Sequence, residues 1–421
     1  MRMAGDGSII ILLAAPAKIR NNDAHYPYRQ DSDMLYLTGF REHDTLLVMI
    51  PDGKQGKSIL FCRSRDPERE MWDGAMVGLD AAVEEYGMDA AYDFTEMEAR
   101  LPGMLQNQDR IYYDLGRNPL FDQRLIGWLN EFRDKPKKTF HAPEEIHALD
   151  HMLHDMRVYK SREELAVMRR SAKVAIEAHE RAMKVCEPGM NEADIHAELM
   201  ATFIRNHCEA SYLPIVGGGA NACVLHYINN RDELKDGELL LIDAGAEFDG
   251  YASDITRTFP ISGKFSSVQK DIYEIVLAAQ EAAFEKARAG NQWQDVHDAA
   301  IRVATDGMIN LGILKHSLEE ELETEGYKQF YVHNTGHWLG LDVHDVGEYD
   351  IDGHSRELEP GMVFTIEPGI YIGPGETTVK KCFRGIGIRI EDNVAITRDE
   401  PRILTGELAK TVNDIEALMA S

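Results

Sequence analysis

Five side chains that could bind metal ions lie in short apolar segments of the second half of this 421-residue chain. Four of them are carboxylates and one is an imidazole, and an unpaired charge is costly in the apolar surroundings that these segments predict. Two divalent cations would supply four positive charges and balance the four carboxylates. This arithmetic predicts a two-metal hydrolase. The five residues are Asp243, Asp254, His337, Glu367 and Glu391.

The two aspartates are predicted to face each other across a hairpin. Residues 238–259 have the pattern of two strands joined at Asp249-Gly250, a dipeptide typical of tight turns. Asp243 would end the first strand, and Asp254 would lie inside the second, where its carboxylate is a few ångströms from that of its partner. The alternative is two ordinary strand-end aspartates, although strand interiors are poor in aspartate.

The two glutamates follow the same logic. Glu367 ends a predicted buried strand at a Pro-Gly turn, which is a suitable position for a ligand. Arg389 and Glu391 are two residues apart, so they share one face of a predicted strand. That polar face could point to the site or to solvent, where the two residues would form a simple ion pair.

Histidines are the second element with chemical potential. Residues 333–345 (HNTGHWLGLDVHD) contain His333, His337 and His344 among glycines and apolar residues. An HxxxH pair can clamp a metal on a helix, but this pattern predicts loop and strand, so we expect only one of the three to be a ligand. His226 follows the glycine-rich IVGGGAN, which suggests close approach to a bound molecule; a structural histidine is the alternative. HExxH, GxSxG and Walker motifs do not occur in the sequence.

The elements that must position these residues fall into two predicted domains, 1–155 and 156–421. In the first, apolar runs alternate with helical segments, which predicts an α/β domain, and residues 26–40 are expected to form a loop. Strands are expected within 8–15, 45–50, 58–62 and 110–115, and helices within 81–87 and 118–132.

The second domain is expected to begin with helices and to end with strands. Ser161 and Glu164 form a capping box before a long helix, and Asn191 caps another. Two amphipathic helices are expected within 268–326. Strands return after Tyr331 and carry most of the chemistry.

Composition excludes several classes of function. The formal net charge of −27 argues against nucleic acid as a partner, because phosphate binding needs a basic face. Five cysteines without a CxxC motif favour reduced thiols and a cytoplasmic protein. Residues 8–17 slightly resemble a secretory signal, but we expect a first β-strand there. No run reaches about 18 apolar residues, so no membrane span is expected.

The order of the five ligand candidates resembles the metal set of the "pita-bread" metallopeptidases, which include methionine aminopeptidase, aminopeptidase P, prolidase and the metal-free creatinase. All five positions match, which disfavours the creatinase branch. The resemblance extends from about residue 10 to residue 418 and is closest to bacterial aminopeptidase P. Asn334, Thr335 and the stretch 375–382 depart from it. The segments that carry it are 26–40, 337–350, 358–372 and 383–392.

This resemblance implies an α/β N-terminal domain followed by an α+β pita-bread (creatinase/methionine aminopeptidase-like) catalytic domain. It implies an enzyme that releases the N-terminal residue from peptides with proline at the second position, by attack of a hydroxide that bridges two Mn²⁺-like ions. Carboxylate-rich sites suit Mn²⁺. The partners implied are Xaa-Pro peptides and further copies of the chain in a homodimer or homotetramer, with no nucleic acid and no membrane.

The resemblance also assigns the metal ligands their places. Asp243 would bind one metal, and Asp254 and Glu391 would bridge both. His337 and Glu367 would complete the second site, and Glu367 would also hold or accept the proton of the attacking water.

Further residues match positions around the substrate. His226 and His344 match histidines that touch the scissile carbonyl and orient the proline, and His333 matches one that lines the pocket for the departing end. Tyr212 and Arg389 match residues that order the ligands. Two positions match residues near the substrate mouth, the second of which would act across a subunit boundary: Asp33 and Trp72.

Two alternatives stay open. A prolidase would cleave only dipeptides, and the difference depends on whether the site is closed behind the second residue. A non-catalytic binding protein on the same fold would have lost ligands, whereas all five are present here.

Overall fold

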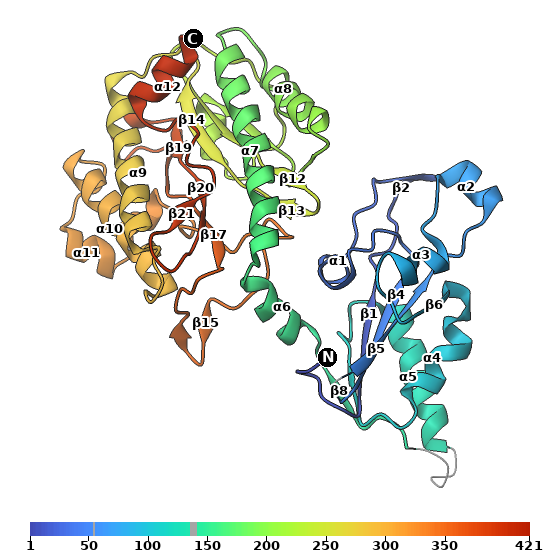
Figure 1. Cartoon of the computed structure of the whole chain (residues 1–421). Helices are drawn as coiled ribbons and strands as arrows, with labels where there is room; N and C mark the ends of the chain where they lie inside the picture. Colours follow the sequence, from blue (N-terminus) through green and yellow to red (C-terminus); the bar gives the residue numbers. More distant parts are fainter. Residues whose placement is uncertain (54, 135–140) are drawn as a thin grey trace. The chain divides into compact units, whose positions relative to one another are not determined.

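The computed structural model describes residues 1–53, 55–134 and 141–421. They form two compact units, Met1–His154 and Asp155–Ser421 (Figure 1). None of the helices within the described residues combines the length and apolar character needed to cross a bilayer.

The first unit is built on a six-stranded sheet with the strand order β6-β5-β4-β1-β7-β8. β1 pairs antiparallel with β4 and parallel with β7, so the sheet is mixed. All four strands expected in this unit are confirmed. The strands are β1 (Ser8–Leu13), β4 (Leu46–Asp52), β5 (Gln55–Cys62), β6 (Ala90–Asp93), β7 (Arg110–Tyr112) and β8 (Glu145–His147).

The apolar run of β1 is buried on both faces of this sheet. Ile9 and Ile11 pack with α4 (Met97–Leu105) and α5 (Pro119–Asp134), and the alternate residue Ile10 belongs to the cluster on the opposite face. This is the two-residue period of a strand that is covered on both sides. Both expected helices are present, the shorter one starting earlier, as α3 (Gly78–Glu84).

The expected loop 26–40 is wrong in part, because it contains helix α1 (Ser32–Thr38). Asp31 caps that helix: its side chain accepts hydrogen bonds from the backbone N–H groups of Asp33 and Met34. The mixture of aromatic and polar residues has no clear helical period, so the cap was the only local signal. The exposed helix α2 (Pro67–Asp73) follows later in this unit.

Long helices enclose the second unit, and its strands run between them (Figure 1). The capping boxes at Ser161 and Asn191 are present, with α7 and α8 behind them. The two helices expected within 268–326 are confirmed, and a short third one follows. α6 (Asp150–Val158) contains the boundary between the units, and the helices that follow it are α7 (Arg162–Val185), α8 (Glu192–Arg205), α9 (Ser267–Lys286), α10 (Trp293–Asn310), α11 (Leu318–Glu323) and α12 (Val412–Met419).

Short antiparallel strands make the centre of this unit. One sheet has the order β10-β11-β14, another β13-β12-β9 and a third β17-β20-β21, while β18 pairs with β19. Their bounds are β9 (Glu209–Ala210), β10 (Ile215–Gly218), β11 (Leu239–Asp243), β12 (Ala246–Phe248), β13 (Tyr251–Ala252), β14 (Thr256–Pro260), β17 (Val363–Ile366), β18 (Gly369–Ile372), β19 (Ile386–Arg389), β20 (Asp392–Ala395) and β21 (Arg402–Ile403).

The predicted hairpin is correct in its turn but wrong in its strands. Asp249 and Gly250 turn the chain with positive φ of 52° and 86°, but each predicted strand is divided in two. The backbone approaches itself closely at the break: a Cβ on Gly245 would lie 1.7 Å from the Ser253 carbonyl oxygen. Asp254 therefore lies between β13 and β14, outside any strand.

Two further predicted strand positions are also loops. Glu391 lies between β19 and β20, and the segment 333–345 is a loop with one isolated bridge, from Trp338 to Phe364. Because these residues lie outside the hydrogen-bonded strands, their backbone does not have to follow the alternation of a strand, and their side chains can turn toward the same region.

Candidate metal centre

All five ligand candidates line one cavity of about 350 Å³ in the second unit. The same cavity is lined by His226, His333, His344 and Arg389. The two aspartates thus face the same space, and the alternative of a solvent-facing ion pair at Arg389 is wrong. Arg389 and Glu391 are only 4% and 2% exposed.

Strand ends converge on this cavity. Asp243 is the last residue of β11 and is paired with Thr256 of β14. Glu367 follows β17, and Glu391 precedes β20, which pairs with β17. The backbone N–H of Glu391 donates to the carbonyl of Thr256 at 3.0 Å, which joins the two sheets directly behind the carboxylates.

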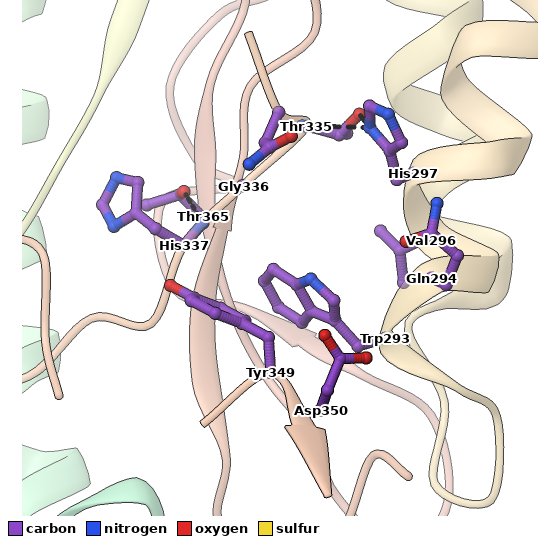
Figure 2. A pocket seen from close by; sticks show the side chains of 11 residues that line it. Trp293, Gln294, Val296, His297, Thr335, Gly336, His337, Tyr349, Asp350 and Thr365 are labelled. Atoms are coloured by element: carbon purple, nitrogen blue, oxygen red, sulfur yellow. Dashed lines mark hydrogen bonds between the residues drawn. The ribbon is translucent and has the colours of Figure 1, made fainter. Parts of the chain in front are cut away.

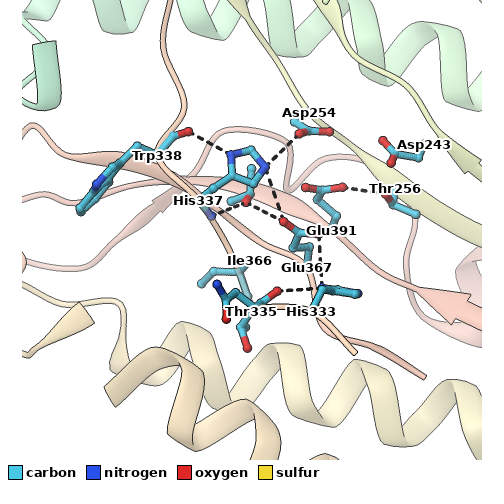
Figure 3. A network of polar contacts seen from close by, with 12 residues as sticks. Asp243, Asp254, Thr256, His333, Thr335, His337, Trp338, Ile366, Glu367 and Glu391 are labelled. Atoms are coloured by element: carbon cyan, nitrogen blue, oxygen red, sulfur yellow. Dashed lines mark hydrogen bonds and ion pairs between the residues drawn. The ribbon is translucent and has the colours of Figure 1, made fainter. Parts of the chain in front are cut away.

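Asp254, His337 and Glu391 form the tightest group, with one ligand atom from each residue lying within 4.8 Å of the others. His337 Nε2 is 3.3 Å from Asp254 Oδ2 and 3.5 Å from Glu367 Oε1 (Figure 3). His337 Nδ1 donates to the carbonyl of Trp338 at 2.9 Å. That bond directs Nε2 toward the carboxylates, as metal-binding histidines require.

The electrostatics show carboxylates that the protein alone does not balance. Burial raises the pKa of Glu391 well above its ordinary value, and Asp254 and Glu367 raise it further. Burial also raises the pKa of Asp243, and that of Glu367 to about 7. Burial would lower the pKa of His337, but Asp254 and Glu367 outweigh burial and raise it to about 9. A donor set of this kind fits divalent cations, which favour the ionised carboxylates.

Asp254 differs from the other three carboxylates. Burial would raise the pKa of Asp254, but the hydrogen bond and charge of His337 outweigh burial and lower it. One imidazole therefore already compensates Asp254 and the guanidinium of Arg389 pairs with Asp243, while Glu367 and Glu391 remain to be compensated.

Tyr212 and Arg389 hold the ligands from behind. The Tyr212 hydroxyl contacts Asp254 and lies 2.5 Å from Asp243 Oδ1. One Arg389 nitrogen donates to Asp243 Oδ2 at 2.5 Å, and another donates to the hydroxyl of Tyr371 at 2.9 Å. Arg389 Nε also donates to Thr256 Oγ1 at 3.0 Å. Tyr212 and Arg389 thus both contact Asp243 directly. Arg389 also reaches Glu391 through Thr256.

Three residues around the site were missed from the sequence. Thr256 donates to Glu391 Oε2 at 2.6 Å, and Tyr371 bonds to His333 Nε2 at 2.7 Å. Thr365 accepts a hydrogen bond from the backbone N–H of His337 at 3.0 Å. The available signal was a polar residue inside an apolar strand, where it needs a partner.

The other histidines surround the cavity without joining the tight group. The ring of His344 lies edge-on to that of His337, with centroids 4.3 Å apart. His333 Nδ1 donates to the carbonyl of Asn334 at 2.7 Å, and burial lowers the pKa of His333 to about 4. His226 is exposed at the cavity wall. Only one of the three histidines in 333–345 thus belongs to the tight group.

Asp33 and Trp72 belong to the first unit. Asp33 is 2% exposed and lies 3.6 Å from the imidazole of His154 and 3.8 Å from the guanidinium of Arg117. Trp72 on α2 is 87% exposed.

A second cavity of about 320 Å³ shares Asn334, Gly336, His337 and Tyr349 with the first (Figure 2). Trp293, Val296 and His297 of α10 form its other side. In its wall the Tyr331 hydroxyl and His297 Nδ1 bond to Thr335 Oγ1 at 2.7 and 2.8 Å. The departures at Asn334 and Thr335 therefore line this neighbouring cavity, and neither is one of the five candidate ligands.

Comparisons with known proteins agree with this geometry. Residues 166–398 match the model of metallopeptidase family M24, and residues 1–112 match that of the aminopeptidase P N-terminal domain. The Xaa-Pro aminopeptidase of Escherichia coli K12 is 43% identical over 99% of this chain and 94% of its own. The structure of Pseudomonas aeruginosa aminopeptidase PepP is 52% identical over 99% of this chain and 94% of that one, with a TM-score of 0.97. Zinc-substituted E. coli aminopeptidase P in complex with product is 43% identical over the same shares, with a TM-score of 0.96.

The chain belongs to metallopeptidase family M24. Within that family it has the architecture of aminopeptidase P, an α/β N-terminal domain followed by an α+β pita-bread catalytic domain. The expected fold class and the resemblance are both confirmed.

Proposed function

We propose that this protein is a metal-dependent aminopeptidase that releases the N-terminal residue from peptides with proline at the second position. The observation that carries the proposal is the convergence of four carboxylates and one imidazole in one cavity. Full-length relatives named Xaa-Pro aminopeptidase favour this function over a prolidase. A non-catalytic binding protein is disfavoured because no ligand position has been lost.

The proposed cofactors are two divalent metal ions of the Mn²⁺ type. Asp243 would hold one ion, His337 and Glu367 the other, and Asp254 and Glu391 both. When bound, such ions lower the pKa of a water and stabilise the developing oxyanion. Oxygen-rich donors suit Mn²⁺. Zinc is the alternative to test, since an E. coli relative has been obtained zinc-substituted.

The protein groups around the ions would handle the substrate. Glu367 would accept the proton of the attacking water, and Tyr212 and Arg389 would keep the ligands in place. His344 and His226 would donate hydrogen bonds to the carbonyl of the bond to be cleaved. His333 is neutral at pH 7, because its pKa is about 4. With both ring nitrogens engaged, His333 suits a fixed wall for the proline side.

Selectivity for proline follows from its chemistry. Proline lacks the backbone N–H, and its ring holds φ at about −65°. A pocket shaped for that ring rejects ordinary peptides, because selectivity is a difference in transition-state binding.

The test compares release of alanine from Ala-Pro-Ala and Ala-Ala-Ala by the Mn²⁺-loaded protein. We expect the rates to differ by several orders of magnitude. A Glu391→Ala preparation purified in parallel measures any contaminating peptidase. Comparable wild-type rates would overturn the assignment in favour of a broad aminopeptidase on this fold.

Peptide length separates aminopeptidase from prolidase. The second cavity adjoins the first at Asn334 and His337, so the open space continues past the cavity that the candidate ligands line. We therefore expect Ala-Pro-Ala to be cleaved at least as well as Ala-Pro. Cleavage of Ala-Pro alone would indicate a prolidase.

Three further assignments belong to this proposal. Residues 1–155 would be the aminopeptidase P-type N-terminal domain and 156–421 the catalytic domain. The protein would be a homodimer or homotetramer, for which the apolar exposed pair Met71 and Trp72, at 82% and 87%, offers contact surface. A cytoplasmic location is supported by its cysteines, all of which are free thiols.

A further inference from the structure

Three buried charges meet at the end of the loop that carries His337 and His344. Asp345 is 6% exposed. Its Oδ1 lies 2.5 Å from a guanidinium nitrogen of Arg157, and its Oδ2 lies 2.9 Å from Lys160 Nζ. Arg157 also lies 2.7 Å from Asp342 Oδ2. Arg157 comes from the last turn of α6, and Lys160 from the residues that join α6 to α7.

Stability alone is a poor reason for such a cluster. Burying ions costs desolvation, and apolar side chains of similar size often stabilise a fold equally well or better. An ion cluster instead fixes the relative positions of its side chains, because each charged group must lie next to its partner.

The loop is closely fitted around this cluster. A Cβ on Gly340 would lie 2.1 Å from Asp345 Oδ2 and 2.9 Å from Lys160 Cε. Only glycine leaves the room that the ion pair occupies. The backbone N–H of Asp342 also points to Asp345 Oδ1, at 3.4 Å. The Asp345 carboxylate is thus the centre around which residues 340–345 turn.

The backbone of Asp345 connects this turn to the metal centre. Its N–H donates to the carbonyl of Trp338 at 2.9 Å. The same carbonyl accepts the bond from His337 Nδ1. His344, the neighbour of Asp345, then rests its ring against that of His337 at an interplanar angle of 84°.

We propose that Asp345, held by Arg157 and Lys160, is a positioning residue that sets the orientation of His344. This inference rests on the proposed function, since His344 is assigned there to the scissile carbonyl. Removing the charge of Asp345 loosens the turn, and His344 loses its alignment with the substrate. A misplacement of about 1 Å can cost on the order of 10²-fold in rate.

The first measurement is kcat and KM of Asp345→Asn with Ala-Pro-Ala, with Mn²⁺ added and the rate expressed per bound metal. We expect kcat to fall about 10- to 100-fold, with KM changed far less. Lys160→Met is the second variant, which leaves the carboxylate but removes one of its cations, and we expect a smaller loss of kcat.

Asp155→Asn is the matched control. It breaks another ion pair of the segment 155–160, between Asp155 and the buried Arg356 at 2.6 Å, which does not involve Asp345. We expect its kcat to equal that of the wild type. An equal loss in Asp155→Asn and Asp345→Asn would show that any ion pair of this segment matters equally, which overturns the proposal.

A double-variant cycle with His344→Ala separates positioning from general damage. If Asp345 acts through His344, adding Asp345→Asn to His344→Ala should lower kcat by less than about threefold, because the group it positions is already gone. Losses that multiply fully, or an unchanged kcat in Asp345→Asn, would refute the positioning role. Wild-type protein inactive on Ala-Pro-Ala would instead refute the proposed function.

Discussion

Glu391 and Asp392 are neighbours in the chain and are both buried, yet their surroundings are opposite. Asp392 lies 2.7 Å from a guanidinium nitrogen of Arg257 and 3.0 Å from Lys410 Nζ. Glu391 faces Asp254, Glu367 and Asp243, and its described hydrogen bond comes from the neutral Thr256.

The pKa values follow this difference. Burial would raise the pKa of Asp392, but Arg257 and Lys410 outweigh burial and lower it. Burial raises the pKa of Glu391, and the neighbouring carboxylates raise it further. Successive side chains near a strand point in opposite directions. The Asp392 side chain points to two cations of the protein itself. The Glu391 side chain points into a cavity whose carboxylates external cations must balance.

The largest expected effect is that of Glu391→Ala on catalysis. It removes a ligand assigned to both ions, so metal content should fall at two positions and activity should be abolished. Atomic absorption and turnover of Ala-Pro-Ala measure both. A variant with full metal content and near-normal turnover would move Glu391 out of the site.

Asp392→Asn tests the other half of the comparison. It leaves Arg257, which is fully buried, without a full counter-charge, and breaking a buried pair costs about 3–5 kcal/mol. We expect the free energy of unfolding in denaturant to drop by about that amount. Metal stoichiometry of the folded fraction should remain that of the wild type. A loss of metal without a loss of stability would contradict the contrast.

Variants of His337 and His344 test which histidine of the loop binds metal and which contacts only the substrate. His344→Ala should keep both metals and lower kcat by about 10²-fold, because a positioned hydrogen-bond donor is lost. His337→Ala should lose metal. Metal analysis of the two variants side by side decides the assignment, and the opposite pattern would mean that the two roles are reversed.

The sequence predicted which five candidate ligands line one cavity, because acidic residues in apolar segments require compensation. It could not predict that Asp254 and Glu391 lie outside strands. Those breaks depend on contacts between distant segments, such as the approach of Gly245 to Ser253 and the bond from Glu391 to Thr256. The partners that make Asp392 structural are also distant: Arg257 is 135 positions away.

The same limit applies to finer features. The capping box at Ser161 is local, and the helix behind it was predicted correctly. Thr335 looked like an unexplained departure, because its partner His297 lies on another element, 38 positions away. Local rules thus predicted elements and ligand types, while the pairing of buried polar groups required the fold.

The smallest expected effect is on stability after removal of the metal, which should reveal the unbalanced carboxylates. Chelation should lower the melting temperature, because ligands that bind only the folded state stabilise it.

The stability of the chelated protein should also depend on pH. Glu367 has a folded-state pKa of about 7, above its ordinary 4.5, so the folded form holds a proton that the unfolded form releases. Its contribution to stability is present below pH 4.5 and is lost as the pH rises through 7, with a slope of at most about 1.4 kcal/mol per pH unit for one proton. We therefore expect the melting temperature of the chelated protein to be higher at pH 5.5 than at pH 8. The metal-loaded protein, measured at the same two pH values, is the reference for this difference. Glu367→Gln, which is neutral at both pH values, should reduce that difference, and the raised pKa values of Glu391 and Asp243 leave the remainder. Equal melting temperatures with and without chelator at pH 8, together with unchanged activity, would show that these carboxylates hold no metal.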